Sequence, residues 1–255
     1  MRGVTNFIMD TGDEFVGEGG TFRFPQIGAI AATAWGAGGT ITYTANTEAT
    51  TTVVPTIVYT AVEIYDDVLN TTVGDMPKKY GPALAEGYYQ DIEETILAQH
   101  ASTITTVGAS TAGYNFLEAD YWGALEQLHA NAKDKAIAGQ NITAIYHPLQ
   151  LGAWGQTQNF VSAAVRGDKG NGPAMTGVFD MAGGAKVFFT SNVRTLTAAI
   201  NNLVICKPWL ILGRAAKAKI EMERTELRLR VICSGQYGVK VQSSLCGVRH
   251  LVQSV

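Results

Sequence analysis

The stretch from residue 28 to residue 62 limits most strongly what this chain can fold into. Two threonine-rich segments with strand-like composition, residues 40–44 and 56–60, flank a polar region around residues 50–52. This pattern predicts two extended arms joined in a long, hairpin-like loop. The loop has few large apolar side chains at its tip, so it cannot fold compactly alone. We expect it to be stabilised by another surface.

The remainder of the chain has enough apolar material for a packed core. Its 255 residues are 46% hydrophobic and 16% charged, which excludes a disordered protein and predicts one or two domains. Glycine is abundant, with 28 residues, and threonine is frequent in the first half. Both favour turns and strands over a helical bundle, so the composition predicts an α+β or mostly β fold. The helical patterns below favour α+β.

Two helices are predicted from apolar periodicity. The first follows Gly81-Pro82, a suitable first turn for proline, and continues to about residue 100. Its apolar residues recur every four positions along one stripe, at Leu84, Tyr88, Ile92 and Ile96. Such a helix is a rod of about 30 Å. The second helix is predicted to start near Asn115, with Glu118 three residues later as in a capping box.

Strand-like and loop-like segments complete the pattern. Residues 142–146 predict a strand that breaks at His147-Pro148 into a further helix, and residues 186–190 predict another strand. Residues 167–173 have turn-forming residues at nearly every position and predict an exposed loop. Near the C-terminus, residues 227–233 and 237–241 predict two strands joined by a turn at residues 234–236.

Nothing in the sequence predicts a catalytic, cofactor or metal site. The four histidines have no metal-ligand spacing, and there is no phosphate-binding glycine loop or nucleophile elbow. The cysteines lie in apolar stretches without a CxxC pair, which favours buried thiols in a reducing cytoplasm. No signal peptide or membrane-spanning stretch is evident, so we expect a soluble protein made inside a cell.

The charges are distributed unevenly in a chain whose net charge is only −3. Residues 1–77 have nine acidic and two basic residues, a net charge of −7, whereas residues 207–250 have nine basic and three acidic residues, a net charge of +6. Oppositely charged segments favour a contact within or between subunits, although both could simply be solvated. The candidates for an intersubunit contact are Glu48, Glu63, Asp66, Asp67, Arg224, Arg228 and Arg230.

The order of these segments resembles the major capsid proteins of tailed bacteriophages, which have the Hong Kong 97-like fold. Each matching motif is weak alone, and their order along nearly the whole chain carries the resemblance. The motifs are Gly12-Asp13-Glu14-Phe15, residues 20–25, the helix at residues 83–97, Ile145-Tyr146-His147-Pro148, residues 177–193, Tyr237-Gly238-Val239-Lys240-Val241 and Gly247-Val248-Arg249-His250-Leu251.

This resemblance implies an α+β chain with four parts. They are an N-terminal arm at residues 1–27, an extended loop at 28–62, a peripheral domain at 63–110 and 211–244 with the long spine helix, and an axial domain at 111–210 and 245–255. The arm and the loop would embrace neighbouring subunits. The acidic arm and loop would then lie across the basic strands of an adjacent peripheral domain.

The resemblance also implies the partners and the location. The subunit would form hexamers and pentamers in a virion shell, assemble in the host cytoplasm, and enclose double-stranded DNA without sequence specificity. A portal and a separate scaffolding protein would be further partners, a decoration protein would be an optional one, and no membrane would be involved. The scaffold is expected because the chain begins almost at once with the arm, unless a leader was removed. No lysine or arginine lies between Phe24 and Pro77, so a lysine cross-link from the loop is not expected.

Two alternatives remain open at the level of the sequence. An encapsulin-type nanocompartment resembles the same fold and would enclose a cargo enzyme in place of DNA. An α+β enzyme could use residues 167–173 as a lid, although no nucleophile, base and orienting group occur together. Particle contents separate the first alternative from a capsid, and oligomer size separates the second.

Overall fold

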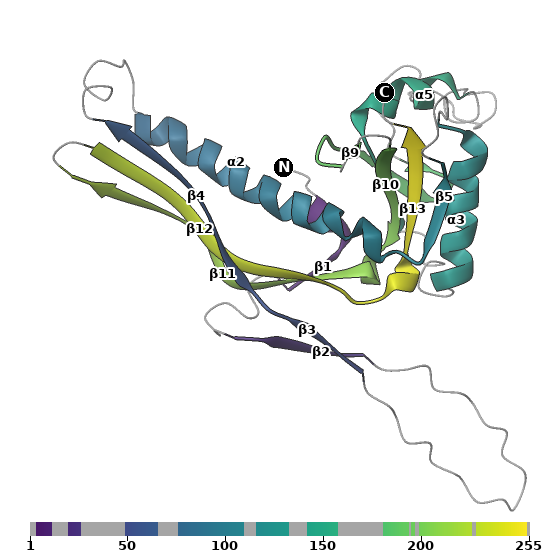
Figure 1. Cartoon of the computed structure of the whole chain (residues 1–255), viewed down its shortest axis with the longest axis horizontal. Coiled ribbons are helices and arrows are strands. Elements are labelled where there is room, and N and C mark those ends of the chain that lie inside the picture. The colour runs from purple at the N-terminus through teal and green to yellow at the C-terminus, as the bar shows by residue number, and fades with distance from the viewer. Residues whose placement is uncertain are drawn as a thin grey trace, which may run out of the picture.

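The computed structural model describes residues 4–11, 20–26, 49–65, 76–109, 116–132, 142–157, 181–193, 195–196, 199–225 and 228–253. These residues form an elongated molecule with two separate β-sheets and a projecting hairpin, as Figure 1 shows. A long helix lies along the first sheet, and shorter helices pack around the second sheet. The α+β class predicted from the sequence is confirmed.

The first sheet has four strands in the order β1-β11-β12-β4. Its two long strands, β11 (Leu210–Arg224) and β12 (Arg228–Val241), are antiparallel, and β12 also pairs with β4 (Thr56–Tyr65) over that strand's whole length. The short strand β1 (Met9–Asp10) adds to β11 in parallel. At about 3.3 Å per residue, the 14 residues of β12 reach about 45 Å, which gives this half of the molecule its length.

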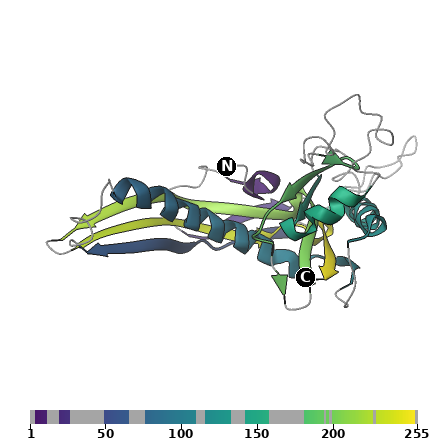
Figure 2. The same cartoon turned by 90° about the horizontal axis from the view of Figure 1, so that it is seen from above.

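Helix α2 (Met76–Leu97) covers one face of this sheet and continues into the 3-10 helix η2 (Ala98–Ser102) (Figures 1 and 2). The predicted apolar stripe is confirmed, because Tyr88, Ile92 and Ile96 are buried and Leu84 packs against the core. The predicted start at Pro82 was wrong. The helix begins six residues earlier, at Met76, and Pro82 lies inside it, where proline cannot donate the usual hydrogen bond to the carbonyl four residues earlier.

The turn predicted at residues 234–236 is also absent, because β12 runs through this segment without interruption. Ser234, Gly235 and Gln236 pair with residues 57–59 of β4 in an unbroken register. Gly235 is required here for a different reason. A Cβ atom at this position would lie 2.2 Å from the Tyr88 hydroxyl oxygen, so the missing side chain lets α2 approach the sheet.

The second sheet has seven strands among the described residues. Six follow the order β5-β13-β10-β6-β8-β7, and β9 pairs with β10. The central strands β10 and β6 are buried at every residue, as expected when both faces of a sheet are covered. The strands are β5 (Thr105–Gly108), β6 (Ile142–Tyr146), β7 (Met181–Ala182), β8 (Ala185–Phe189), β9 (Thr195–Leu196), β10 (Ala199–Cys206) and β13 (Gly247–Gln253).

Short helices surround this second sheet. Helix α3 (Glu118–Ala132) packs on β13, β10 and β5, with Tyr121, Leu125 and Leu128 buried as the sequence predicts. The proline after β6 opens the predicted helical segment, formed by η3 (Pro148–Gln150) and α5 (Leu151–Gln156). Two further 3-10 helices, η4 (Lys207–Trp209) and η5 (Ser244–Cys246), lie where the chain passes between the sheets.

The first described residues are attached to the body of their own subunit. Val4, in the 3-10 helix η1 (Val4–Phe7), is buried and donates its backbone N–H to the Glu93 carboxylate at 3.0 Å. Farther along, the Arg214 side chain makes two contacts to the Asp10 carboxylate, at 2.6 and 3.1 Å. Residues 4–11 therefore pack on α2 and β11 of their own subunit, and contact of the N-terminal arm with neighbouring subunits stays a prediction.

The projecting hairpin has β2 (Phe22–Gln26) antiparallel to β3 (Ala49–Val53). Its base is fixed to the first sheet, where Phe22 and Val53 form a small core with Ile211 and Ala215. The sequence predicted residues 56–60 as the second arm of this hairpin. That prediction was wrong, because these residues pair with β12 instead. Residues 27–48, including the predicted strand at 40–44, lie outside the described residues.

Two segments belong to a different sheet from the one that the expected domain boundaries imply. Residues 105–108 were expected in the peripheral domain, but β5 pairs in parallel with β13 of the second sheet. Residues 56–62 were expected in the extended loop, but they belong to the first sheet. No helix among the described residues is long and apolar enough to cross a membrane.

Candidate intersubunit surface

The face of the first sheet that α2 leaves uncovered is the candidate interaction surface. Side chains alternate across a sheet, so Ile64, Leu229 and Val231 face α2 and pack in a buried cluster with it. Their neighbours in sequence lie on the opposite face. We call this set the open face: Ile57, Tyr59, Ala61, Glu63 and Tyr65 of β4, Arg228, Arg230, Ile232, Ser234 and Gln236 of β12, and Lys219, Glu221 and Glu223 of β11.

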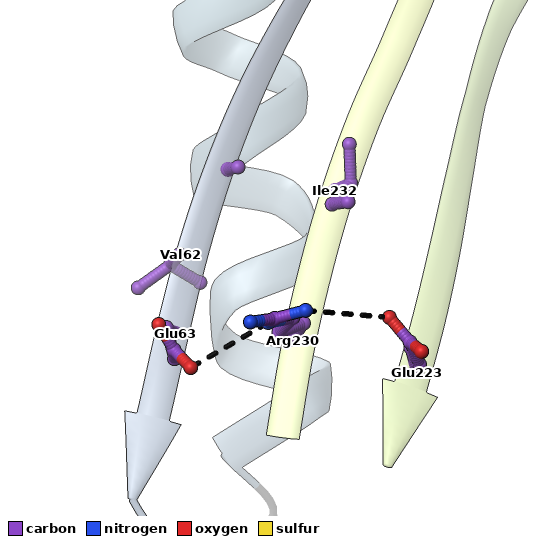
Figure 3. A pocket seen from close by; sticks show the side chains of 6 residues that line it. Val62, Glu63, Glu223, Arg230 and Ile232 are labelled. Carbon is purple, nitrogen blue, oxygen red and sulfur yellow. Dashed lines mark ion pairs between the residues drawn. The ribbon is translucent and has the colours of Figure 1, made fainter. Parts of the chain in front are cut away.

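Charged side chains cross the open face from strand to strand. Glu63 lies opposite Arg230, and Arg230 lies opposite Glu223, so the register brings alternating charges into one row. The Arg230 guanidinium is 3.5 Å from the Glu63 carboxylate and 3.8 Å from the Glu223 carboxylate (Figure 3). Arg228 makes the shortest contact, 2.6 Å, to the same Glu63. The row lines a hollow of about 340 Å³.

These contacts keep Glu63 ionised. Its hydrogen bond with Arg228 lowers the pKa of the Glu63 carboxyl below its ordinary value, and the charge of Arg230 adds to the effect. All three side chains are well exposed to water, so the pairs themselves contribute little to folding. They leave a fixed pattern of charge on the surface, which is suited to recognising a partner with the complementary pattern.

Large apolar side chains on the outer strand β4 accompany the charges. Ile57 is 74% exposed, Tyr59 is 68% exposed and Tyr65 is 59% exposed. They lie on the same face at the edge of the sheet, and they are the residues that the sequence analysis missed. A signal was present, because residues 56–65 have apolar or aromatic side chains at both alternating sets of positions. Apolar side chains on both faces of a strand indicate that both faces are covered by other surfaces, whereas in this structure α2 covers only one face.

The predicted contact residues divide into three groups in the structure. Glu63, Arg228 and Arg230 come together on the open face, within one subunit. Arg224 lies opposite Leu229, which places it on the other face of the sheet. Glu48, Asp66 and Asp67 lie outside the described residues, as does the predicted loop at 167–173. Contact of these residues with a neighbouring subunit stays a prediction.

The second sheet holds a buried polar group rather than a surface. The Tyr146 hydroxyl is 2.7 Å from His250 Nδ1, and both side chains are fully buried, with Phe116 and Trp154 around them. Asn202 lies opposite His250 in the sheet and donates its side-chain N–H to the Gln150 side-chain oxygen at 3.0 Å. Among the described residues, no group of three or more histidine, cysteine, aspartate or glutamate side chains could hold a metal ion.

His250 should make the stability of the subunit depend on pH. Burial lowers the pKa of His250 from 6.5 to about 4, a shift that the charge of Asp120 partly opposes. Between pH 6.5 and about pH 4, His250 binds a proton more readily in the unfolded chain than in the folded chain. The contribution of His250 to the free energy of unfolding is therefore complete above pH 6.5 and is lost as the pH falls toward 4. We expect the free energy of unfolding to fall by about 3 kcal/mol from this group between pH 7 and pH 4.

Denaturant titrations of the unassembled chain at several pH values measure this dependence. The variant His250→Asn keeps a hydrogen-bonding group near Tyr146 but does not titrate in this range. Its stability is expected to depend less on pH than that of the wild type. Parallel curves for the two proteins between pH 4 and pH 7 would show that His250 does not carry the effect.

Comparisons with known proteins give the fold a family context. No protein-family model and no curated protein sequence matches the chain. Solved structures match over nearly its whole length. A chain from the capsid of Cyanophage P-SCSP1u superposes with a TM-score of 0.73 and 15% identity, covering 96% of this chain and 86% of the other. The fold is that of tailed-phage capsid proteins.

Further phage structures share this fold. A chain of Mycobacterium phage Che8 has a TM-score of 0.72 at 14% identity, covering 96% of this chain and 89% of its own. The capsid of Ralstonia phage GP4 gives 0.66 at 13% identity, with 98% and 87% covered. The capsid fold, with its Hong Kong 97-like architecture, was predicted from the order of weak motifs, and that prediction is confirmed.

Proposed function

We propose that the chain is the major capsid protein of a tailed phage, a structural subunit that forms an icosahedral shell around double-stranded DNA. The capsid fold over nearly the whole chain is the observation that carries this proposal. The open face supports it, because large apolar side chains and a fixed charge row occur together on an exposed sheet. In a shell that surface would be covered by another copy of the chain.

The proposal includes the other partners expected from the resemblance. Hexamers and pentamers of the chain would build the shell in the host cytoplasm, with a portal, a separate scaffolding protein and an optional decoration protein. Contact with DNA would be weak and non-specific, because the chain has a net charge of −3 and no basic surplus to neutralise phosphates. The domain division, with a peripheral domain around α2 and an axial domain around the second sheet, belongs to the same proposal.

Negative-stain electron microscopy of the purified protein tests the function. Closed shells of uniform size, alone or with a co-expressed scaffold, are the expected result. A small oligomer at high concentration under both conditions would contradict it. The nucleic acid and protein content of the particles separates a phage capsid from the encapsulin alternative, which would enclose an enzyme.

Charge reversal on the open face tests the intersubunit contact. Arg228→Glu or Arg230→Glu is expected to reduce the yield of shells at least tenfold while the unassembled chain stays folded. Exposed ion pairs contribute about 0–1 kcal/mol each to folding, but a shell repeats the same intersubunit contact many times. Particle yield after sedimentation and the circular dichroism spectrum of the unassembled chain measure the two effects.

A compensating variant separates contacts within the subunit from contacts between subunits. Arg228→Glu combined with Glu63→Arg restores an internal pair with the charges exchanged. If the charge row faces another subunit, this double variant should still assemble poorly. Lys186→Glu on β8, an exposed lysine of the second sheet, is the matched control and should assemble normally. Recovery of assembly in the double variant would show that the row acts only within one subunit.

A further inference from the structure

Three described segments pass between the two sheets, and two of them, through η4 and η5, run side by side in opposite directions; we call this pair the neck. The chain leaves β10 at Cys206, passes through η4, runs out along β11 and returns along β12. It then passes through η5 and enters β13 directly after Cys246. Every residue of the long β11–β12 hairpin therefore lies between these two cysteines, as the path of the chain in Figure 1 shows.

The register places the two cysteines opposite each other. In the second sheet, Ile205 of β10 lies opposite Gly247 of β13. Four residues farther along each segment, the Trp209 carbonyl oxygen accepts a hydrogen bond from the Ser243 backbone N–H at 3.2 Å. The same oxygen also accepts the Gln242 N–H at 2.9 Å, and the first sheet begins with Leu210 opposite Val241, so the register shifts by one residue beyond the neck while the two segments stay side by side. Cys206 and Cys246 are each one residue beyond the Ile205–Gly247 pair, where the ladder of the second sheet ends, so they face each other as the next position of that alignment.

Residues that directly follow a paired position in an antiparallel ladder lie near the spacing that a disulfide requires. Partners in antiparallel strands have Cα atoms about 4.5–5.5 Å apart, and disulfides bridge Cα atoms about 4.4–6.8 Å apart. Both side chains are fully buried, and the structure has both as thiols. The third thiol, Cys233, lies in the first sheet opposite Thr60 of β4, away from the neck.

We propose that Cys206 and Cys246 form a cross-strand disulfide when the protein meets a low-molecular-weight disulfide such as oxidised glutathione. One thiolate attacks oxidised glutathione, forms a mixed disulfide and releases one glutathione. The second thiolate attacks the protein sulfur of that mixed disulfide and releases the second glutathione. Two electrons pass from the protein thiols to oxidised glutathione, which leaves one disulfide in the chain.

The neighbouring residues allow this reaction despite the burial of both sulfur atoms. Lys207 follows Cys206 and is exposed, and Leu245, which precedes Cys246, is 46% exposed. In this proposal, local opening of the three-residue helix η5 brings Cys246 to the solvent. The bond would close a ring that contains both β11 and β12, so it would fix the neck between the two sheets. This inference does not depend on the proposed function.

Peptide mapping of the full chain tests the proposal. The three cysteines fall on separate tryptic peptides, residues 195–214, 231–240 and 241–249, because trypsin does not cleave between Lys207 and Pro208. The protein is incubated with oxidised glutathione, alkylated without reduction and digested. The expected product joins peptides 195–214 and 241–249, with a mass about 2 Da below their sum, while peptide 231–240 is alkylated.

Variants make the result specific. Cys233→Ser should form the same cross-link as the wild type, whereas Cys206→Ala and Cys246→Ala should form none. The cross-linked wild type should also unfold at a temperature about 5 °C or more above the reduced protein, because the ring constrains the unfolded chain. The proposal would be overturned by cross-links to Cys233. It would also be overturned if all three cysteine peptides were alkylated after incubation with oxidised glutathione. The mapping of the wild type decides it even if an alanine variant fails to fold.

Discussion

Replacing Gly235 with alanine is expected to separate α2 from the first sheet and to abolish shell assembly. A methyl group at this position would lie 2.2 Å from the Tyr88 hydroxyl oxygen and 2.7 Å from the adjacent ring carbon. Tyr88 is buried and packs edge-on against Tyr237, with ring centroids 6.0 Å apart. The Tyr88 ring therefore cannot move aside without displacing Tyr237, whose hydroxyl donates a hydrogen bond to Asp91 of α2 at 2.6 Å.

We expect Gly235→Ala to lower the free energy of unfolding by about 3 kcal/mol, in the range for overpacked cores. Denaturant titration followed by circular dichroism measures the loss, and particle yield measures its consequence. Gly152→Ala is the matched control, because a Cβ atom there meets nothing within 4 Å. In a Tyr88→Ala background the same change at Gly235 should cost little. An equal cost with and without the Tyr88 ring would contradict the explanation.

The sequence predicted the elements that bury a single periodic stripe and missed the features that depend on distant partners. The apolar stripe of α2 and the strand-to-helix break at His147-Pro148 were predicted because the pattern is local. Gly235 was read as a turn residue, because the need for a glycine there comes from the close approach of Tyr88, almost 150 residues earlier in the sequence. Similarly, the pairing of β4 with β12 joins residues about 170 positions apart, which composition cannot indicate.

The sequence predicted charged residues of the candidate surface but not the exposed apolar side chains beside them. The excess of basic residues after position 207 directed attention to Arg228 and Arg230, and the structure places both beside Glu63. Which charges share a face depends on strand register, so Arg224 could not be separated from the other two before the pairing was known. The exposed apolar side chains of β4 could be identified only once the position of α2 was known, because α2 covers one of the two apolar faces of the strand and leaves the other uncovered.

Truncation of Trp154 to alanine is the second change expected to have a large effect, in the other half of the molecule. Trp154 is completely buried at the centre of an aromatic cluster. Its ring stacks on Phe116, with centroids 5.0 Å apart, and meets Tyr121 and Tyr146 edge-on at 5.0 and 5.1 Å. These residues come from the segment before α3, from α3 itself and from β6, so the indole joins three parts of the domain.

Removing the indole would leave a cavity that these rings cannot fill without breaking the contact between Tyr146 and His250. We expect Trp154→Ala to lower the free energy of unfolding by about 3–5 kcal/mol. That is a large share of the about 5–15 kcal/mol that stabilises a typical domain, so shells should not form at 37 °C. Denaturant titration and particle yield are the measurements.

The same substitution in the same domain provides the control. Trp122 lies on α3 with 44% of its surface exposed, so Trp122→Ala leaves a gap that water can fill and should cost about 1 kcal/mol. The difference between the two variants reports burial rather than the loss of an indole as such. Equal losses of stability would mean that the aromatic cluster does not hold the second sheet and its helices together. The half of the molecule around the second sheet would then owe its stability to the fully buried strands β6 and β10.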